Sequence, residues 1–129
     1  MSANPIKTLL EHAHAKVDDA TRHLGELLAS EHACEVKLDM LVQYRVEYRN
    51  RFMQAASSGI GPDAWRNYSG FIAKLDDAIS LQQTIVDQSK AQTANGKQEW
   101  MHERNRMKAF DALSQRQATL DQRKQIKQE

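Results

Sequence analysis

The sequence is poor in residues that interrupt helices and in residues that build compact cores. It contains two prolines and five glycines among 129 residues, and aromatic side chains make up only 6% of it. Two long stretches therefore carry almost no helix breakers, and the apolar material is thin for a globular core. Because 27% of the residues are charged and the mean hydropathy is −0.72, the composition favours helices that bury a narrow apolar stripe.

Cysteine and long hydrophobic runs are equally scarce. The single cysteine, Cys34, excludes an internal disulfide and is typical of a reducing compartment. No apolar run approaches the roughly 18 residues of a membrane span, and residues 1–7 lack the apolar core of a signal peptide. The net charge of +1 gives no global attraction to nucleic acid. We therefore expect a soluble, cytoplasmic protein with no nucleic-acid partner and only peripheral contact with a membrane.

Apolar residues at alternating spacings of three and four run through the first half of the chain. The two seam positions are Leu10, Val17, Leu24, Glu31, Leu38, Arg45 and Phe52, and Ile6, Ala13, Ala20, Leu27, Cys34, Leu41, Tyr48 and Ala55. A sustained repeat of about 3.5 residues indicates a coiled coil with a partner helix. Asn4 is a good N-cap and Pro5 a good first helical residue, so the pattern predicts a helix over residues 4–57.

A short turn and a second helix follow. Gly59 suits a left-handed helix end, and Pro62 suits the start of the next helix, which gives a turn over residues 58–61. The second seam reads Trp65, Tyr68, Ile72, Leu75, Ile79, Gln82, Val86, Ser89, Thr93, Gly96, Trp100, Glu103, Met107 and Phe110, then slips by one residue to Leu113 and Leu120. The slip indicates either a stammer in the coiled coil or the end of the paired structure. The seam is polar between Gln82 and Gly96, and Gly96 is the weakest point of this helix because glycine is a poor helix former.

The short turn forces the two helices to run antiparallel. The predicted fold is all-α, a single coiled-coil domain over residues 1–129 in which two long helices, 4–57 and 62–127, form a hairpin. When the seams are paired about the turn, the last ten or so residues have no partner helix. Residues 97–129 also hold eight Lys and Arg against five Asp and Glu, which indicates either a solvated face or a docking surface for an acidic partner.

Motifs for catalysis, cofactor binding and metal binding are not found. The sequence has no glycine-rich phosphate loop and no nucleophile elbow. His12 and His14 lie two residues apart and so point to different sides of a helix, which prevents them from sharing a metal. Two helices also offer no enclosed pocket in which carboxylates could be activated. The sequence therefore predicts a binding protein that is not an enzyme, with no catalytic residue, cofactor or metal.

Aromatic residues gather on both sides of the turn. Each helix of a hairpin buries only one seam, so Tyr44, Trp65 and Phe71 have apolar surface left over beside it. Two interpretations stay open: these rings thicken and staple the end of the hairpin, or they form an exposed patch that docks a partner.

Specific strings in this region resemble a known family. Residues 37–50, KLDMLVQYRVEYRN, resemble the L-x-x-Y-x-x-E-Y-R-N segment of the FliJ family of flagellar type III export proteins. After the turn, Trp65, Tyr68, Phe71 and Leu75 are also similar to that family. The resemblance spans about residues 6–115 and is most specific over residues 37–82.

The resemblance implies partners and site residues. FliJ-like proteins resemble the central stalk of rotary ATP synthases and are cytoplasmic parts of the export apparatus, located peripherally at the inner face of the cell membrane at the flagellar base. The implied partners are the export ATPase hexamer, the cytoplasmic domain of the membrane export gate and the flagellar substrate chaperones. The implied gate-contacting residues are Lys37, Leu41, Tyr44, Tyr48, Phe71, Leu75, Ala78 and Gln82. The basic C-terminal end, with Arg104, Arg106, Lys108 and Arg116, is expected to contact the ATPase. The alternative is a general coiled-coil chaperone escort or scaffold of a secretion system.

Overall fold

Two helices account for almost all of the structure. The computed structural model describes residues 4–128, and within them α1 covers Pro5–Ser57 (53 residues) and α2 covers Pro62–Gln128 (67 residues). The part of the chain that is described contains no strand. The all-α class and the pairing of two long helices are thereby confirmed.

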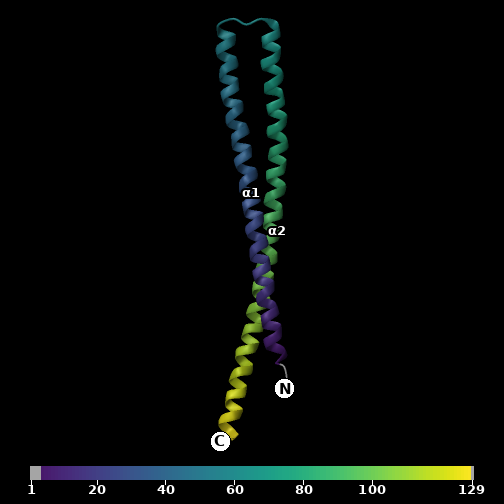
Figure 1. The fold of residues 1–129 in the computed structure, drawn as a ribbon, viewed down its shortest axis with the longest axis vertical. Helices are drawn as coiled ribbons and strands as arrows, with labels where there is room; N and C mark the ends of the chain where they lie inside the picture. Colours follow the sequence, from purple (N-terminus) through teal and green to yellow (C-terminus); the bar gives the residue numbers. More distant parts are fainter. Residues whose placement is uncertain (1–3, 129) are drawn as a thin grey trace. The chain divides into compact units, whose positions relative to one another are not determined.

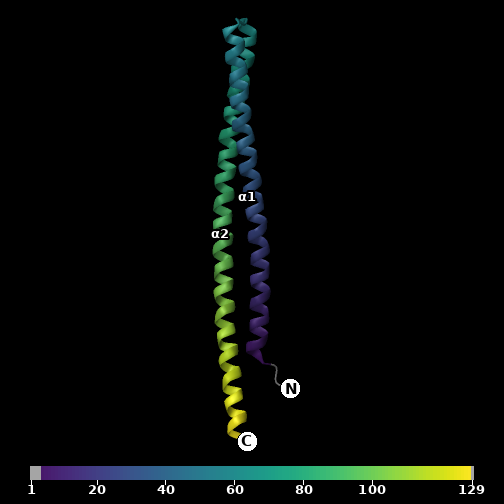
Figure 2. The same cartoon turned by 90° about the vertical axis from the view of Figure 1, so that its left-hand side faces the viewer.

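The described residues divide into two compact units. We call Leu28–Gln92, which contains the turn, the loop-end unit, and the described residues of Met1–Leu27 and Thr93–Glu129 the terminal unit. In each unit a segment of α1 and a segment of α2 lie side by side and run in opposite directions (Figure 1 and Figure 2). On α2 the division falls between Gln92 and Thr93, within the polar stretch of the second seam.

The ends of α1 are set by their capping residues. The Ile6 N–H donates to Oδ1 of Asn4 at 3.1 Å, so Asn4 is the N-cap and the helix begins at Pro5, one residue after the expected start. At the other end Gly59 has a φ of 87°, and its N–H donates to the Ala56 carbonyl at 3.2 Å. A glycine adopts this left-handed conformation without steric cost, and that conformation ends the helix.

The core of the loop-end unit is a single line of side chains between the helices. Leu75 and Val86 of α2 are buried, with 7% and 2% of their surface exposed. Leu41 and Tyr48 of α1 are half-buried on the facing seam. Because two helices enclose only one such line, most other side chains of the unit reach solvent.

The core of the terminal unit is built around small residues. Ala13 is buried, and Gly96 allows the side chain of Leu27 to approach so closely that a Cβ at position 96 would lie 2.5 Å from Leu27 Cδ1. The ring nitrogen Nε1 of Trp100 donates to Oγ1 of Thr21 at 2.9 Å and joins α2 to α1. The helix α2 passes through Gly96 without interruption, and the glycine serves close packing between the helices.

The polar stretch of the second seam is buried in both units. In the loop-end unit Gln82 and Ser89 are buried, and Nε2 of Gln82 donates to the Cys34 carbonyl at 3.0 Å. In the terminal unit Oγ1 of Thr93 donates to the Leu27 carbonyl at 3.4 Å. These hydrogen bonds satisfy polar side chains on the seam and therefore allow polar residues to occupy a buried position.

The predicted slip of the repeat at Leu113 and Leu120 is wrong. Those leucines are 44% and 49% exposed, whereas Ser114 and Gln117 are half-buried. The spacing of three and four residues continues unchanged from Phe110. It places the polar Ser114 and Gln117 on the seam, although the apolar Leu113 lies next to Ser114. Residues 118–128 are helical and all exposed. Across residues 4–128, neither helix has a stretch long and apolar enough to cross a membrane.

Candidate partner-binding surfaces

The eight residues that the FliJ resemblance assigns to the export gate all lie in the loop-end unit. The structure brings three of their rings together across the two helices. The Tyr44 and Phe71 centroids are 6.0 Å apart with planes at 84°, and the Tyr48 and Phe71 centroids are 4.4 Å apart at 46°. Edge-on and tilted contacts at these distances are favourable for aromatic pairs.

The same rings belong to a larger set that extends to the turn. The ring centroids of Tyr48 and Tyr68 are 5.5 Å apart. The Phe52 centroid lies 5.3 Å from that of Tyr68 and 4.9 Å from that of Trp65. We call the connected rings the aromatic cluster. Its members are Tyr44, Tyr48, Phe52, Trp65, Tyr68 and Phe71.

The aromatic cluster combines packing with exposure. Its rings pack against one another between α1 and α2, yet Tyr44 is 42% and Trp65 is 51% exposed. The two interpretations of these aromatics are therefore compatible, because one face of a ring packs while the other remains open to solvent.

Burial divides the eight residues into those that offer surface and those that do not. Lys37 and Tyr44 are exposed, whereas Leu75 and Gln82 are buried, with 7% and 4% of their surface exposed. The rest are half-buried, namely Leu41, Tyr48, Phe71 and Ala78. Leu75 and Gln82 thus support the packing beneath the surface, and Lys37 and Tyr44 are the two of the eight that are exposed to solvent.

Two exposed apolar residues that the sequence reading omitted lie next to these. Met40 is 66% exposed and Val36 is 42% exposed, and both line a shallow groove with Lys37, Leu41 and Tyr44. The spacing of four residues from 36 to 40 to 44 places these side chains on one ridge of α1. That spacing is the signal that could have found them, but both lie off the seam on which the reading concentrated.

Charged residues cross between the helices on the loop-end unit. Arg45 forms an ion pair with Asp76, and Nζ of Lys90 lies 3.7 Å from Oε1 of Glu35. Arg45 occupies a seam position, and its pairing with Asp76 explains how a cation is accommodated there. Exposed pairs of this kind contribute little stability and chiefly fix which residues face each other.

The four basic residues expected to contact the ATPase all lie on α2 in the terminal unit and are exposed. Arg104 lies over the Trp100 ring at 5.3 Å, and Arg106 lies over the Phe110 ring at 5.7 Å. Residues two apart on a helix point to different sides, so these two arginines flank the seam on opposite sides. Lys108 shares a face with Arg104, whereas Arg116 lies more than two turns further along α2.

Among residues 4–128, no three or more His, Cys, Asp or Glu side chains are grouped so as to hold a metal ion. Cys34 is a half-buried free cysteine on the seam.

Comparison with known proteins shows the family of the chain. The profile of the family described as "Flagellar FliJ protein" matches residues 1–129. The chain is 33% identical to the flagellar FliJ protein of Escherichia coli (strain K12) over 114 residues, covering 88% of this chain and 78% of that protein. It is 32% identical to the flagellar FliJ protein of Salmonella typhi over 112 residues, covering 87% and 76% of the two chains. A match of this extent to both the profile and its relatives shows that the chain belongs to the flagellar FliJ protein family.

Proposed function

We propose that the chain is a non-enzymatic stalk and adaptor of flagellar type III protein export that binds the export ATPase, the cytoplasmic domain of the export gate and substrate chaperones. Membership of the FliJ family supports the role as a flagellar export component. The assignment of the three partners follows the family resemblance of residues 37–82. The protein acts in the cytoplasm, at the inner face of the membrane beneath the flagellum.

The observation that carries the gate contact is the exposed edge of the aromatic cluster. Tyr44 is held by Tyr48 and Phe71 at ring distances of 6.2 and 6.0 Å, yet it keeps 42% of its surface open. A ring fixed in this way loses little conformational freedom on binding, which is a property of residues that dominate protein interfaces. Tyr44 with Met40 therefore forms the anchor for the gate.

The ATPase contact is proposed for the terminal unit. Its basic residues are exposed and in part fixed by aromatic rings, as Arg104 is by Trp100. A stalk acts on a ring of ATPase subunits only if it binds some states of the ring better than others. Exposed cations on a stiff helix supply a contact that depends on where acidic groups of the ring lie.

The test of the whole proposal is co-purification of the full chain with the export ATPase and, separately, with the cytoplasmic domain of the export gate. Both complexes are expected. Recovery of substrate chaperones alone would favour a general chaperone escort instead. Unchanged oligomerisation and turnover of the ATPase in the presence of the chain would exclude the stalk role.

The gate contact has a sharper test in one substitution. Tyr44→Ala is expected to weaken gate binding by about tenfold or more, as truncation of an interface anchor does. Helicity should be largely unchanged, because Tyr44 is 42% exposed. Binding is measured by isothermal titration calorimetry and helicity by circular dichroism.

The matched control is Leu81→Ala, which removes a 64% exposed apolar side chain from α2 in the same unit. It should leave gate affinity unchanged. Equal losses of gate affinity in the two variants would contradict the anchor role of Tyr44. A loss of helicity in Tyr44→Ala would show that the rings only hold the two helices together.

A further inference from the structure

A row of exposed side chains runs along α1 in the loop-end unit. Val42, Val46 and Met53 are 41%, 48% and 60% exposed. Asp39 and Arg49 are also exposed and complete a spacing of three, four, three and four residues from position 39 to position 53. Residues at this spacing line one face of a helix. We call these five residues the α1 ridge.

The α1 ridge lies on the opposite side of α1 from Tyr44. Each residue of the ridge directly follows a residue of the seam, as Val46 follows Arg45, whereas Tyr44 directly precedes Arg45. Successive residues are turned by about 100° around a helix, so the ridge and Tyr44 flank the seam on opposite sides. A partner bound at Tyr44 therefore leaves the α1 ridge uncovered.

The stability of the helix does not explain the apolar residues of the α1 ridge. Valine is a poorer helix former than alanine, leucine, lysine or glutamate, so an exposed valine does not favour α1 itself. Single exposed apolar residues are common on soluble proteins. Val42, Val46 and Met53 instead share one face, and a continuous apolar surface of this kind is typical of a contact with another chain.

The two charged residues of the α1 ridge are not paired with each other or with α2. The ion pairs among residues 4–128 include neither Asp39 nor Arg49. Arg45, on the neighbouring seam, is by contrast paired with Asp76. Asp39 and Arg49 are therefore available to charges of a second molecule.

The order of the residues along the α1 ridge is self-complementary. Asp39 precedes Val42 by three residues, and Arg49 follows Val46 by three. A second copy of α1, turned by 180° about the midpoint of the two valines, places Val42 against Val46 of the second copy and Asp39 against Arg49 of the second copy. A twofold axis repeats each of these contacts. A parallel arrangement would place Asp39 against Asp39 and Arg49 against Arg49, and like charges repel.

We infer that the α1 ridge binds a second copy of the chain, with the two α1 helices antiparallel about Val42 and Val46. Two ion pairs between Asp39 and Arg49 fix the direction and the register of the helices, and the valines form the apolar centre. The net charge of +1 gives little general repulsion between copies. Stable interfaces bury about 800 Å² per partner, and five residues on each side form a small contact, so the dimer is weak and reversible.

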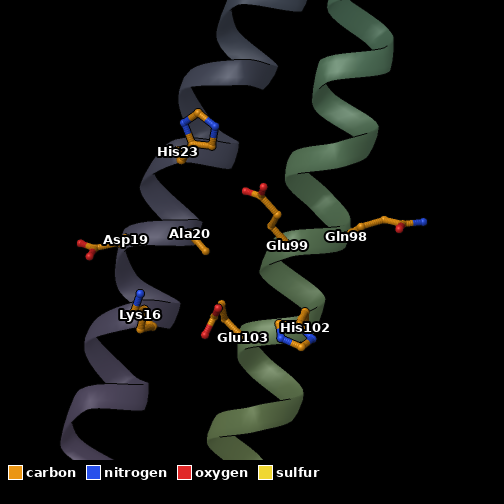
Figure 3. A pocket seen from close by; sticks show the side chains of 8 residues that line it. All are labelled: Lys16, Asp19, Ala20, His23, Gln98, Glu99, His102 and Glu103. Atoms are coloured by element: carbon orange, nitrogen blue, oxygen red, sulfur yellow. The ribbon is translucent and has the colours of Figure 1, made fainter.

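The polar cleft of the terminal unit does not offer a comparable surface. Lys16, Asp19 and Ala20 line it from α1, and Glu99 and Glu103 are among the residues that line it from α2 (Figure 3). Ala20 is the one apolar side chain among its eight lining residues. Removing so many charged groups from water is unfavourable when little apolar surface is buried with them. Self-association is therefore expected at the α1 ridge.

This inference goes beyond the proposed function, because it requires no protein other than the chain itself. Sedimentation equilibrium of the full chain measures it, in a reducing buffer that keeps Cys34 from linking two chains. The average mass should rise with concentration from that of one chain towards that of two. Asp39→Arg and Arg49→Asp should each weaken self-association by about tenfold or more, since each variant brings like charges together at both ends of the contact.

Mixing the two charge variants gives the sharpest test. Asp39→Arg carries arginine at both positions and Arg49→Asp carries aspartate at both, so one chain of each restores two ion pairs. Native mass spectrometry, with one variant labelled with ¹⁵N, should detect the heterodimer although neither variant associates with itself. The matched control is Arg51→Asp, a charge reversal at an exposed residue that precedes the seam, and it should leave self-association unchanged.

The apolar centre is tested by replacing Val42 and Val46 together with alanine. Association should fall by about tenfold or more, because four valine side chains are shortened at one interface. Helicity should be retained, since alanine is the better helix former. Leu81→Ala, which shortens a 64% exposed side chain of α2, is the matched control and should have no effect on association.

Three outcomes would overturn the inference. A parent chain that stays a monomer at the highest attainable concentration would leave the α1 ridge to a different protein. Association that survives both Asp39→Arg and the valine substitutions would place the dimer contact on another surface. A mixture of the two charge variants that forms no heterodimer would exclude the pairing of Asp39 with Arg49 of the second copy.

Discussion

The effect of a substitution in this hairpin depends on which side chain of the other helix faces the substituted position. Gly96 and Gly25 are both helical glycines of the terminal unit. A Cβ at position 25 would meet nothing within 4 Å, whereas a Cβ at position 96 would lie 2.5 Å from Leu27 Cδ1. The same substitution therefore removes backbone flexibility at one site and disturbs packing at the other.

A comparison of two substitutions measures this difference. Gly25→Ala is expected to raise the free energy of unfolding by about 0.5–1 kcal/mol, because alanine is the better helix former. Gly96→Ala is expected to lose that gain and to lower the free energy of unfolding, since the Leu27 side chain has to leave its position. Urea denaturation followed by circular dichroism checks both values, and equal gains would show that Leu27 adjusts freely.

Gln82 shows where sequence reasoning ends at this scale. The family resemblance assigns it to the gate surface, yet in the structure it is buried and its amide donates to the Cys34 carbonyl. The spacing placed Gln82 on the seam, but a polar residue on a seam leaves its orientation undecided. Only the position of the carbonyl on the facing helix decides that the amide points inward.

At the scale of the helix, most of the architecture could be predicted because several signals agree. Asn4, Gly59 and Pro62 mark helix ends by their local chemistry, and the structure uses Asn4 as an N-cap and Gly59 at a positive φ. The repeat of 3.5 residues then gives the pairing. The predicted slip is wrong at Leu113 because this apolar residue lies one position away from the seam, where the spacing places Ser114.

Exposed surfaces were harder to predict than helices. Val36 and Met40 lie away from the seam, where no periodic rule requires an apolar residue, so the sequence pattern does not distinguish them and only their exposure does. Glu103 shows the same limit, because the spacing places it on the seam but does not show that its Oε2 oxygen is buried.

The final segment of α2 gives a prediction at the scale of the element. Ser114 and Gln117 are half-buried, whereas residues 118–128 are all exposed. Truncation after residue 117 should therefore change the melting temperature of the remaining chain little, because it removes few buried contacts. Truncation after residue 113 should lower it more, since the last half-buried positions are lost as well.

Thermal melts of the two truncated chains and the full chain make the comparison. The longer truncation also removes Arg116, which the shorter one keeps, so binding of the export ATPase should fall further in the chain that ends at residue 113. A large loss of stability on removing residues 118–128 alone would mean that this segment packs against the rest of the chain.

At the scale of the whole molecule, the two candidate partner-binding surfaces lie in different units. The aromatic cluster lies in the loop-end unit, and the four basic residues expected at the ATPase lie in the terminal unit. Residues 97–129 of the terminal unit hold eight of the 18 Lys and Arg residues and five of the 17 Asp and Glu residues. One chain therefore has separate surfaces of different chemistry, which suits an adaptor that contacts more than one partner.

The stalk proposal makes a quantitative prediction about coupling. If the chain binds one nucleotide state of the export ATPase better than another, nucleotide and chain must change each other's affinity by the same factor, because binding equilibria around a cycle are linked. A factor of five to 150 corresponds to about 1–3 kcal/mol of coupling. Calorimetric titration of the chain into the ATPase with and without a non-hydrolysable nucleotide gives one factor. Titration of the nucleotide with and without the chain gives the other. The two coupling factors should agree. Equal affinity for the chain in both nucleotide states would leave the stalk no means of biasing the ring, and the proposed mechanism would then be wrong even if the complex forms.

Replacing Arg104 and Lys108 by Glu should weaken both the affinity of the chain for the ATPase and the salt dependence of that affinity, since these exposed cations lie on one face of α2.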